Sequence, residues 1–263
     1  MTGRGVLYPA AMPTLHRLPP PGRVSSLVRW FWIPEWDIAP GRASRQELLA
    51  FPACNLAVEP TLVGLAGPTT RRSHRDLAGR GWTVGALLRP AAVPHLTTDP
   101  YVLRDRYQAL DLPDLHRTVA AAVTGRGEGG PAPRPCRRGV HRLAGRDAAR
   151  PPDADGLRAN ALAELVDGDP SVLQVQDAAS RLNVSARTLQ RLARRHVGLS
   201  PAAMIRRRRL QEAAERLRTN PGADLATVAA ELGYADQAHL CGDFRAVLGC
   251  TPSSYRASCP TKS

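Results

Sequence analysis

The sequence contains few aromatic residues and almost no lysine. Phe, Trp and Tyr together make up 5% of its 263 residues, so we expect hydrophobic cores built mainly from Leu, Val and Ala. Lys262 is the only lysine, and arginine therefore carries nearly all of the formal net charge of +13. A basic balance favours a polyanionic partner. The 43% of hydrophobic residues is enough for packed cores.

Cysteine is scarce and irregularly spaced. The cysteines are Cys54, Cys136, Cys241, Cys250 and Cys259. Their number is odd and no two of them form a Cys-x-x-Cys pair, which argues against a zinc site or a disulfide framework. We expect free thiols in a reducing cytosol.

Long hydrophobic runs are missing as well. No run reaches the roughly 18 apolar residues that a membrane-spanning helix needs. Prolines and arginines interrupt the N-terminal stretch, so no signal peptide is expected. The sequence therefore predicts a cytoplasmic protein without a membrane partner.

The first half of the chain has the pattern of a small β-rich domain. Residues 1–23 are rich in Pro, Gly and Arg and are expected to be irregular. Between residues 46 and 110, short apolar runs such as Trp82–Leu88 are broken by Gly and Pro, which favours strands. Short helices are expected near Ala91–Thr97 and over Leu110–Val123.

Aromatic residues are concentrated in the segment Val24–Trp36, which contains Trp30, Phe31, Trp32 and Trp36. In a strand Trp30 and Trp32 share one face, whereas in a helix Phe31 would share a face with residues 27 and 28. Core packing is the simpler interpretation of these aromatic side chains. A stacking platform for a flat ligand is the alternative.

The composition changes sharply between Thr124 and Asp153. This segment holds six Gly, five Pro and seven Arg, which is typical of a flexible linker. We therefore divide the chain into a β-rich effector or dimerisation domain (residues 1–115, cupin-like or similar), a linker (116–152) and a helical domain (153–259). The predicted fold class is α+β, with two helix-turn-helix units joined by a linker helix in the second domain.

The helical domain begins with a predicted helix over residues 156–166, which places residues 157, 161, 162 and 165 on one face. After this helix, one pattern is written twice. The first copy runs from Ala179 to Pro201 and the second from Ala229 to Pro252, with matching positions 50 residues apart before the turn and 51 after it. Each copy reads as helix, tight turn, helix, and then a Gly-x-Ser/Thr-Pro stop. This is the layout of two helix-turn-helix units.

The second helix of the first copy, residues 186–197, has the composition of a DNA-reading helix. Leu189, Ala193 and Val197 form its buried face. From Ala178 to Gln211 the chain has nine arginines and no acid, so a merely solvated charged face is disfavoured. Arg can pair with guanine and Gln with adenine in the major groove. The candidate DNA contacts are Ala186, Arg187, Gln190, Arg191, Arg194 and Arg195, the last two placed for phosphates.

The matching helix of the second copy, residues 237–248, has a thinner polar face. Its candidate contacts are Gln237, Ala238, Cys241, Gly242 and Arg245. A helix over residues 202–217 should act as a rigid spacer between the copies. Arg206 and Arg207 on that helix are candidates for phosphate contacts.

Three stretches, Ser185–Pro201, Arg209–Ala214 and Leu232–Arg256, resemble the DNA-binding domain of AraC/XylS-type bacterial transcription regulators. The resemblance implies seven helices in this domain and two recognition helices that enter successive major-groove segments on one DNA face. The base-reading positions of the family correspond to residues 187, 190 and 191 in the first copy and 237, 238, 241 and 242 in the second. It also implies RNA polymerase as a partner.

The N-terminal half is similar to a small domain of unknown function that precedes this module in some bacterial regulators. The similar segments are Trp30–Trp32, Gly64–Pro68, Val84–Pro90 and Leu103–Arg106. In the family this half usually senses a small molecule or mediates dimerisation. The implied partners are therefore an effector or a second copy of the chain.

The leading hypothesis is a sequence-specific DNA-binding transcription regulator without catalytic residues, metal or cofactor. The alternative is an enzyme acting on DNA or a small molecule, with the helical half as a targeting module. His74 and His95 lie near Asp76 and Asp99 in the sequence, but lone histidines of this kind are usually surface or core residues. No nucleophile with a partnered base is recognisable.

Overall fold

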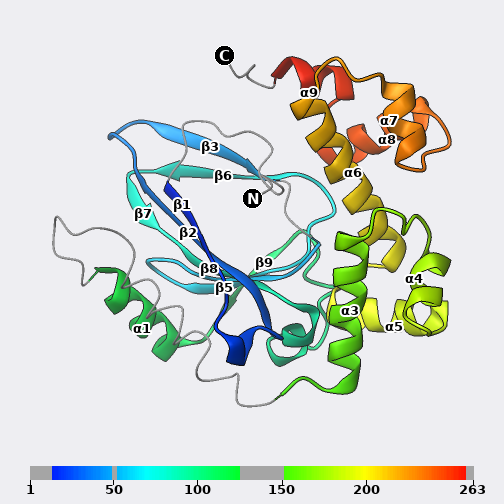
Figure 1. Ribbon diagram of the computed structural model, residues 1–263. Helices are drawn as coiled ribbons and strands as arrows, with labels where there is room; N and C mark the ends of the chain where they lie inside the picture. Colours follow the sequence, from blue (N-terminus) through cyan, green and yellow to red (C-terminus); the bar gives the residue numbers. More distant parts are fainter. Residues whose placement is uncertain (1–13, 49–51, 125–150, 259–263) are drawn as a thin grey trace.

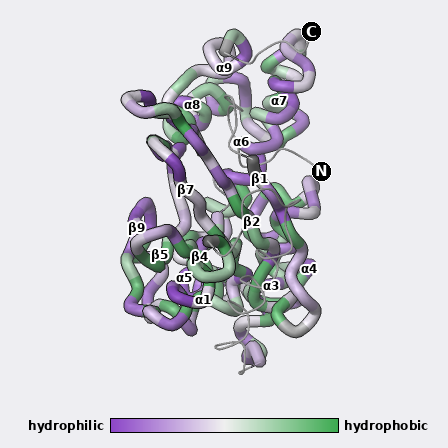
Figure 2. Tube along the Cα trace, turned by 90° about the vertical axis from the view of Figure 1, so that its left-hand side faces the viewer, coloured by the Kyte–Doolittle hydropathy of each residue, from purple (hydrophilic) through white to green (hydrophobic). Residues whose placement is uncertain are grey.

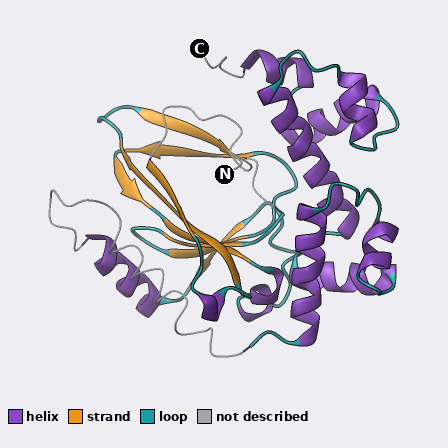
Figure 3. Ribbon diagram, in the orientation of Figure 1, coloured by secondary structure: helices purple, strands orange, loops and turns teal. Residues whose placement is uncertain are grey.

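A computed structural model describes residues 14–48, 52–124 and 151–258. These residues form a sheet domain followed by a helical domain, which confirms the predicted α+β class (Figures 1 and 3). Most of the predicted linker and residues 1–13 of the N-terminal arm lie outside the described residues. The prediction of an irregular arm is wrong at Thr14–Leu18, which form a strand paired with residues 31–35.

The described part of the sheet domain has nine strands. They are β1 (Thr14–Leu18), β2 (Val28–Asp37), β3 (Ala43–Leu48), β4 (Asn55–Val58), β5 (Val63–Ala66), β6 (Ser73–Ala78), β7 (Arg80–Trp82), β8 (Val84–Leu88) and β9 (Tyr107–Leu110). Seven form one antiparallel sheet in the order β1-β2-β8-β4-β5-β9, with β7 beside β2. Strands β3 and β6 form a separate two-stranded sheet.

The aromatic segment is a strand, so the helical alternative is wrong there. Phe31 and Ile33 of β2 are fully buried in the core, whereas Trp30 and Trp32 lie on the opposite face. Trp32 covers Gly85 of β8 so closely that a Cβ atom at Gly85 would lie 2.0 Å from the indole. The indole nitrogen of Trp32 donates to Oδ1 of Asn55 at 3.2 Å. These contacts support the packing interpretation.

The core of the sheet domain lies between the central strands and the helices that cover them. Strands β4 and β5 are largely hydrophobic (Figure 2), and β8 is buried over its whole length. The 3-10 helices η1 (Gly22–Val24) and η2 (Pro90–His95) and helix α1 (Pro113–Thr124) pack against this core. The helix expected at Ala91–Thr97 is therefore present as η2.

Helix α1 belongs to the sheet domain, so the predicted boundary at residue 115 is too early. Val119 and Val123 of α1 are buried in the sheet core. The composition that marks a linker begins only after this helix. Its predicted start at Leu110 is also wrong, because Leu110 pairs with Val63 as the last residue of β9. The helix begins at Pro113, where the missing N–H costs nothing.

Residues 151–258 contain seven helices, the number that the resemblance implies. They are α3 (Ala154–Gly168), α4 (Val175–Arg181), α5 (Ala186–His196), α6 (Pro201–Thr219), α7 (Leu225–Glu231), α8 (Gln237–Leu248) and α9 (Pro252–Ser258). We call α4 with α5 the first unit and α7 with α8 the second unit. In Figure 1 the sheet domain lies on the side of α3 and α6, while α4 and α7 lie on the far side.

The two units have separate hydrophobic cores, and α6 contributes to both. Met204 and Ile205 of α6 pack in the first core. Leu210 and Leu217, about one and a half and about three and a half turns further along, pack in the second. One continuous helix thus connects the two cores, which supports the prediction that it is a spacer.

Helix α3 completes the first core but presents a different face from the one predicted. Asp153 caps its N-terminus by accepting from the Gly156 amide at 2.7 Å. Leu162 is fully buried, but Leu157, which was expected beside it, is 50% exposed. The face that carries Asn160 is turned toward the sheet domain instead, because Asn160 bonds to two backbone groups there.

Candidate nucleic-acid interface

The two tight turns have the same backbone hydrogen bonds. In the first unit the Val184 amide donates to the Ala179 carbonyl at 3.1 Å, and in the second the Tyr234 amide donates to Ala229 at 2.9 Å. Asn183 and Gly233 occupy the left-handed position with φ of 51° and 72°. Asn tolerates this conformation better than other non-glycine residues. The prediction of two equivalent turns is confirmed.

Helices α5 and α8 each begin directly after a capping residue. The Ser185 hydroxyl accepts from the Thr188 amide at 3.1 Å, and the Asp236 carboxylate accepts from His239 at 2.7 Å. These bonds satisfy amides that the helix itself leaves unpaired. The caps therefore fix where α5 and α8 start.

One face of α5 is buried and the other is exposed, as predicted. Leu189 and Ala193 are fully buried and Val197 is 2% exposed. The candidate DNA contacts Arg187, Gln190, Arg191, Arg194 and Arg195 are all exposed, and Ala186 is half-buried. The structure thus gathers the predicted side chains of the first unit on an accessible helix.

An acid from α3 reaches this face, which local sequence reasoning did not anticipate. Arg191 donates from Nη1 to Oδ2 of Asp155 at 2.8 Å. The contact raises the pKa of Arg191 and, together with weaker attraction to Arg158, holds the pKa of Asp155 below its usual value. Asp155 lies 36 residues before Arg191, so no helical spacing links them.

The sheet domain also contacts α5. The Arg194 guanidinium lies 4.7 Å from the centre of the Tyr101 ring, and Arg104 lies 3.6 Å from the same ring. The His196 ring nitrogen Nδ1 is 3.3 Å from the carbonyl oxygen of Pro90. Burial lowers the pKa of His196, since the ring is enclosed at the domain boundary.

Helix α8 exposes fewer polar side chains. Leu240, Phe244 and Leu248 are buried. Gln237, Ala238, Gly242 and Arg245 are exposed and Cys241 is half-buried. No neighbouring atom lies within 4 Å of the place where a Cβ at Gly242 would stand. The second unit therefore offers open helix surface with little hydrogen-bonding capacity.

Arg206 and Arg207 of α6, which were both expected to contact phosphate, lie in different surroundings. Arg206 pairs with Asp243 of α8 at 2.6 Å and keeps about half of its side chain exposed. Arg207 is 4% exposed and donates to the Thr69 hydroxyl at 3.2 Å. Burial lowers the pKa of Arg207 to about 10. In this arrangement Arg207 faces the sheet domain and not a phosphate.

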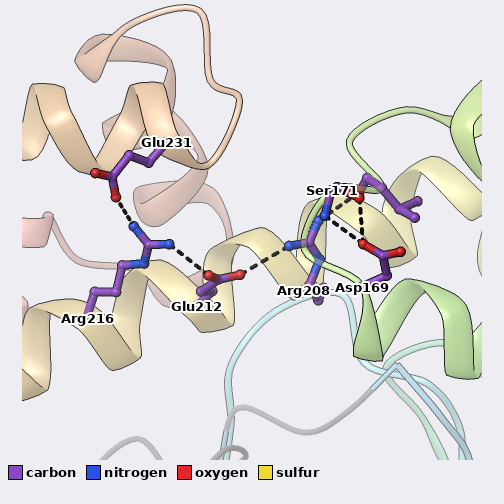
Figure 4. A network of polar contacts seen from close by, with 7 residues as sticks. Asp169, Ser171, Arg208, Glu212, Arg216 and Glu231 are labelled. Carbon is purple, nitrogen blue, oxygen red and sulfur yellow. Dashed lines mark hydrogen bonds and ion pairs between the residues drawn. The ribbon is translucent and has the colours of Figure 1, made fainter.

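Further along α6, alternating charges connect the two units (Figure 4). Arg208 donates to the Val172 carbonyl at 2.7 Å and to Glu212 at 3.1 Å. Glu212 also accepts from Arg216 at 2.9 Å, and Arg216 pairs with Glu231 of α7. These contacts link α6 to the segment before α4 at one end and to α7 at the other.

Contacts between the two domains were missed altogether by sequence reasoning. The side chain of Asn160 accepts from the Ala91 amide at 2.9 Å and donates to the Ser26 carbonyl at 2.8 Å. The ion pairs Arg29–Asp167 and Arg89–Glu164 join the same surfaces. These partners are more than 60 residues apart. A polar residue on the inner side of α3 was the signal that could have found them.

Other site types receive no support within the described ranges. His74 and His95 are exposed, and Asp76 pairs with Arg45 at 2.8 Å. Across residues 14–48, 52–124 and 151–258 there is no cluster of three or more His, Cys, Asp or Glu side chains that could hold a metal. Within the same ranges, every helix is too short or too polar to cross a bilayer.

Comparison with known proteins gives two family matches. Residues 178–258 match a family model described as a helix-turn-helix domain. Residues 16–107 match a domain of unknown function, DUF6597. The second match agrees with the resemblance stated for the first half of the chain.

Curated relatives match the helical domain. An uncharacterized HTH-type transcriptional regulator of Haemophilus influenzae is 33% identical over 84 residues, which are 32% of this chain and 28% of the relative. The HTH-type transcriptional activator RhaS of Pectobacterium carotovorum is 33% identical over 78 residues, or 30% and 28%. The matched region thus spans less than a third of the length of either relative.

Among solved structures, an apo ToxT variant of Vibrio cholerae aligns with 88% of this chain and 98% of its own, at 11% identity and a TM-score of 0.44.

The paired turns and caps lie within the residues that match the helix-turn-helix family model. The resemblance of the helical domain to AraC/XylS-type regulators is therefore confirmed over residues 178–258.

Proposed function

We propose that the protein is a sequence-specific transcription regulator that binds double-stranded DNA through α5 and α8. The exposed face of α5 carries this proposal, because Arg187, Gln190 and Arg191 project from a helix whose opposite face is buried. A helix fits the major groove, where Arg pairs with guanine O6 and N7 and Gln with adenine N6 and N7. The second unit would occupy the next groove segment on the same DNA face.

Asp155 has a part in this mechanism. In the unbound protein its carboxylate accepts from Arg191 at 2.8 Å and holds the guanidinium beside the reading face. A guanine edge would replace the carboxylate, exchanging an exposed ion pair for a bidentate contact. Exposed pairs are weak because water screens them, so this exchange favours the cognate base.

Phosphate contacts fall to arginines at the edges of the reading face. Arg194 and Arg195 lie in the last turn of α5 and are exposed. Arg206 is the α6 arginine that remains half-exposed, and Arg245 is exposed on α8. Such contacts raise affinity for every sequence and make it depend on salt.

For the sheet domain we propose small-molecule sensing or dimerisation, with RNA polymerase as a further partner of the whole protein. The regulator names of the relatives favour a non-enzymatic protein over the alternative of a DNA-targeted enzyme. Sedimentation of the intact chain separates the two roles of the sheet domain. A concentration-dependent dimer supports dimerisation, and a monomer at all concentrations leaves sensing as its role.

Selection from a random pool of duplexes by the intact protein tests the central proposal. We expect enriched sequences with two short elements on one face of the helix, the stronger one requiring α5. The variant Arg187→Ala should bind the enriched sequence more weakly and relax one position in it. Equal affinity for enriched and random duplexes would refute sequence-specific binding.

A further inference from the structure

Two loops of the sheet domain, residues 67–72 and 100–106, are joined to each other by hydrogen bonds. The Thr70 amide and hydroxyl donate to the two carboxylate oxygens of Asp105 at 2.7 and 2.5 Å. The Gly67 amide donates to the Arg106 carbonyl at 3.0 Å, and the Asp105 amide to the Pro68 carbonyl at 3.1 Å. We call these two loops the bridge.

The backbone of the bridge is unusually close-packed. A Cβ at Gly67 would lie 1.9 Å from the Leu103 carbonyl oxygen, so only glycine lets the two loops approach so closely. Asp105 adopts a left-handed conformation with φ of 56°, which short polar residues tolerate. The bridge is therefore a defined structure and not two independent loops.

One end of the bridge touches the first recognition helix. Helix α5 is followed by Gly198 at φ of 79°, and a Cβ there would lie 2.5 Å from the carbonyl oxygen of Pro100. Tyr101, the next residue, stacks against Arg194 of α5. The C-terminal end of α5 thus rests on the bridge.

The other end touches the second recognition helix in an equivalent way. The Arg72 amide donates to the Val247 carbonyl at 2.7 Å, which satisfies an acceptor that α8 leaves unpaired in its last turn. A Cβ at Gly249, which ends α8 at φ of 69°, would lie 3.4 Å from the Arg72 guanidinium. A cation at this end also interacts favourably with the helix dipole.

The middle of the bridge holds the spacer helix. Arg207 of α6 donates to the Thr69 hydroxyl at 3.2 Å, in a position where 4% of the residue is exposed. Asp105 is the acid whose attraction partly offsets the effect of burial on this arginine. The bridge accordingly contacts α5, α6 and α8.

We propose that the bridge sets the position of the second recognition helix relative to the first, and that Asp105 is its central positioning residue. Helix α6 connects the two cores, and the side chain of Leu173 lies against Gly233 of the second turn. The bridge adds a further connection through the sheet domain, which fixes the geometry of the two units. The protein would then accept only one spacing between the two DNA elements. This inference rests on the proposed DNA-binding function.

The test compares the intact wild-type protein with Asp105→Gly, which removes the carboxylate and permits the same backbone conformation. The probes are the enriched duplex and the same duplex with one base pair inserted between its elements. We expect the penalty for insertion to fall about tenfold in the variant. When the two recognition helices are linked more loosely, binding of the second one depends less on the exact spacing of the DNA elements. Thr70→Val should change the penalty in the same direction and keep the bridge backbone.

Asp111→Gly is the matched control, since Asp111 is an exposed acid of the same domain outside the bridge. An unchanged insertion penalty in Asp105→Gly, or a wild-type protein indifferent to insertion, would overturn the inference. Hydrogen exchange at the Arg72 amide gives a measurement without DNA. We expect about tenfold faster exchange in Asp105→Gly and no change in Asp111→Gly.

The two measurements separate failure of the inference from failure of the proposed function. A wild-type protein that enriches no sequence refutes the proposed function. In that case Arg72 exchange alone decides the inference, and an unchanged rate in Asp105→Gly overturns it.

Discussion

The first and second units share a backbone frame and differ in what they expose. Their turn hydrogen bonds and N-terminal caps correspond, and each recognition helix is followed by a left-handed glycine. At the matching surface positions, Gln190 corresponds to Cys241 and Arg191 to Gly242. The frame is constrained by turn and core geometry, whereas the exposed face is free to vary. The repeated backbone frame thus carries two different exposed faces.

Their cores differ as well. Phe244 fills the centre of the second core, and the matching residue of the first unit is Ala193. Leu162 and Val166 of α3 complete the first core, and Leu210 and Leu217 of α6 complete the second. The second core therefore has a large aromatic side chain where the first has only a methyl group.

The largest expected effect tests the difference between the two cores. Phe244→Ala should lower the free energy of unfolding by about 3–5 kcal/mol, since it removes a fully buried ring and leaves a cavity. Ala193→Gly at the matching position should cost only about 1 kcal/mol through helix propensity. Guanidinium denaturation measures both. Similar losses for the two variants would show that the cores are equivalent.

The next effect concerns the reading faces. Arg191→Ala should weaken binding to the selected sequence by about tenfold to a hundredfold and relax one base position. Cys241→Ala on α8 should change affinity less than about twofold, because the side chain is half-buried and brings no strong hydrogen bond. Fluorescence anisotropy at constant salt measures the ratio of specific to random binding. A loss of equal size on both kinds of DNA would remove Arg191 from base reading.

The frame of the helical domain was readable from the sequence because its determinants are local. Asn183 and Gly233 mark the turns, Ser185 and Asp236 the caps, and helical spacing the buried residues. Strands β4, β5 and β8 followed from short apolar runs for the same reason, whereas strands β1, β3 and β6 did not. The pairing of the strands did not follow either, since β8 lies between β2 and β4 through contacts that no local pattern encodes.

The contacts between the two domains, and the burial that they cause, could not be predicted from the sequence. Arg207 had the appearance of a phosphate ligand, and its burial follows only from the position of Thr69. Leu157 fitted a buried helical phase, but α3 turns Asn160 inward because backbone groups of the sheet domain bind it. The candidate face of α5 was correctly placed on the surface, while its partners Asp155 and residue 101 were not foreseen.

The smallest expected effect concerns the exposed face of α8. Gly242→Ala should stabilise the protein by about 0.5–1 kcal/mol, because glycine loses more backbone entropy in a helix than alanine does. An added Cβ at residue 242 meets no neighbouring atom within 4 Å, so no strain offsets this gain. If the second unit mainly docks on DNA, affinity for the selected sequence should stay within about twofold. Thermal unfolding and anisotropy measure the two quantities. A stabilised variant that binds DNA much more weakly would show that DNA approaches the α8 backbone at Gly242. The second unit would then recognise DNA through close backbone contact and not through hydrogen-bonding side chains.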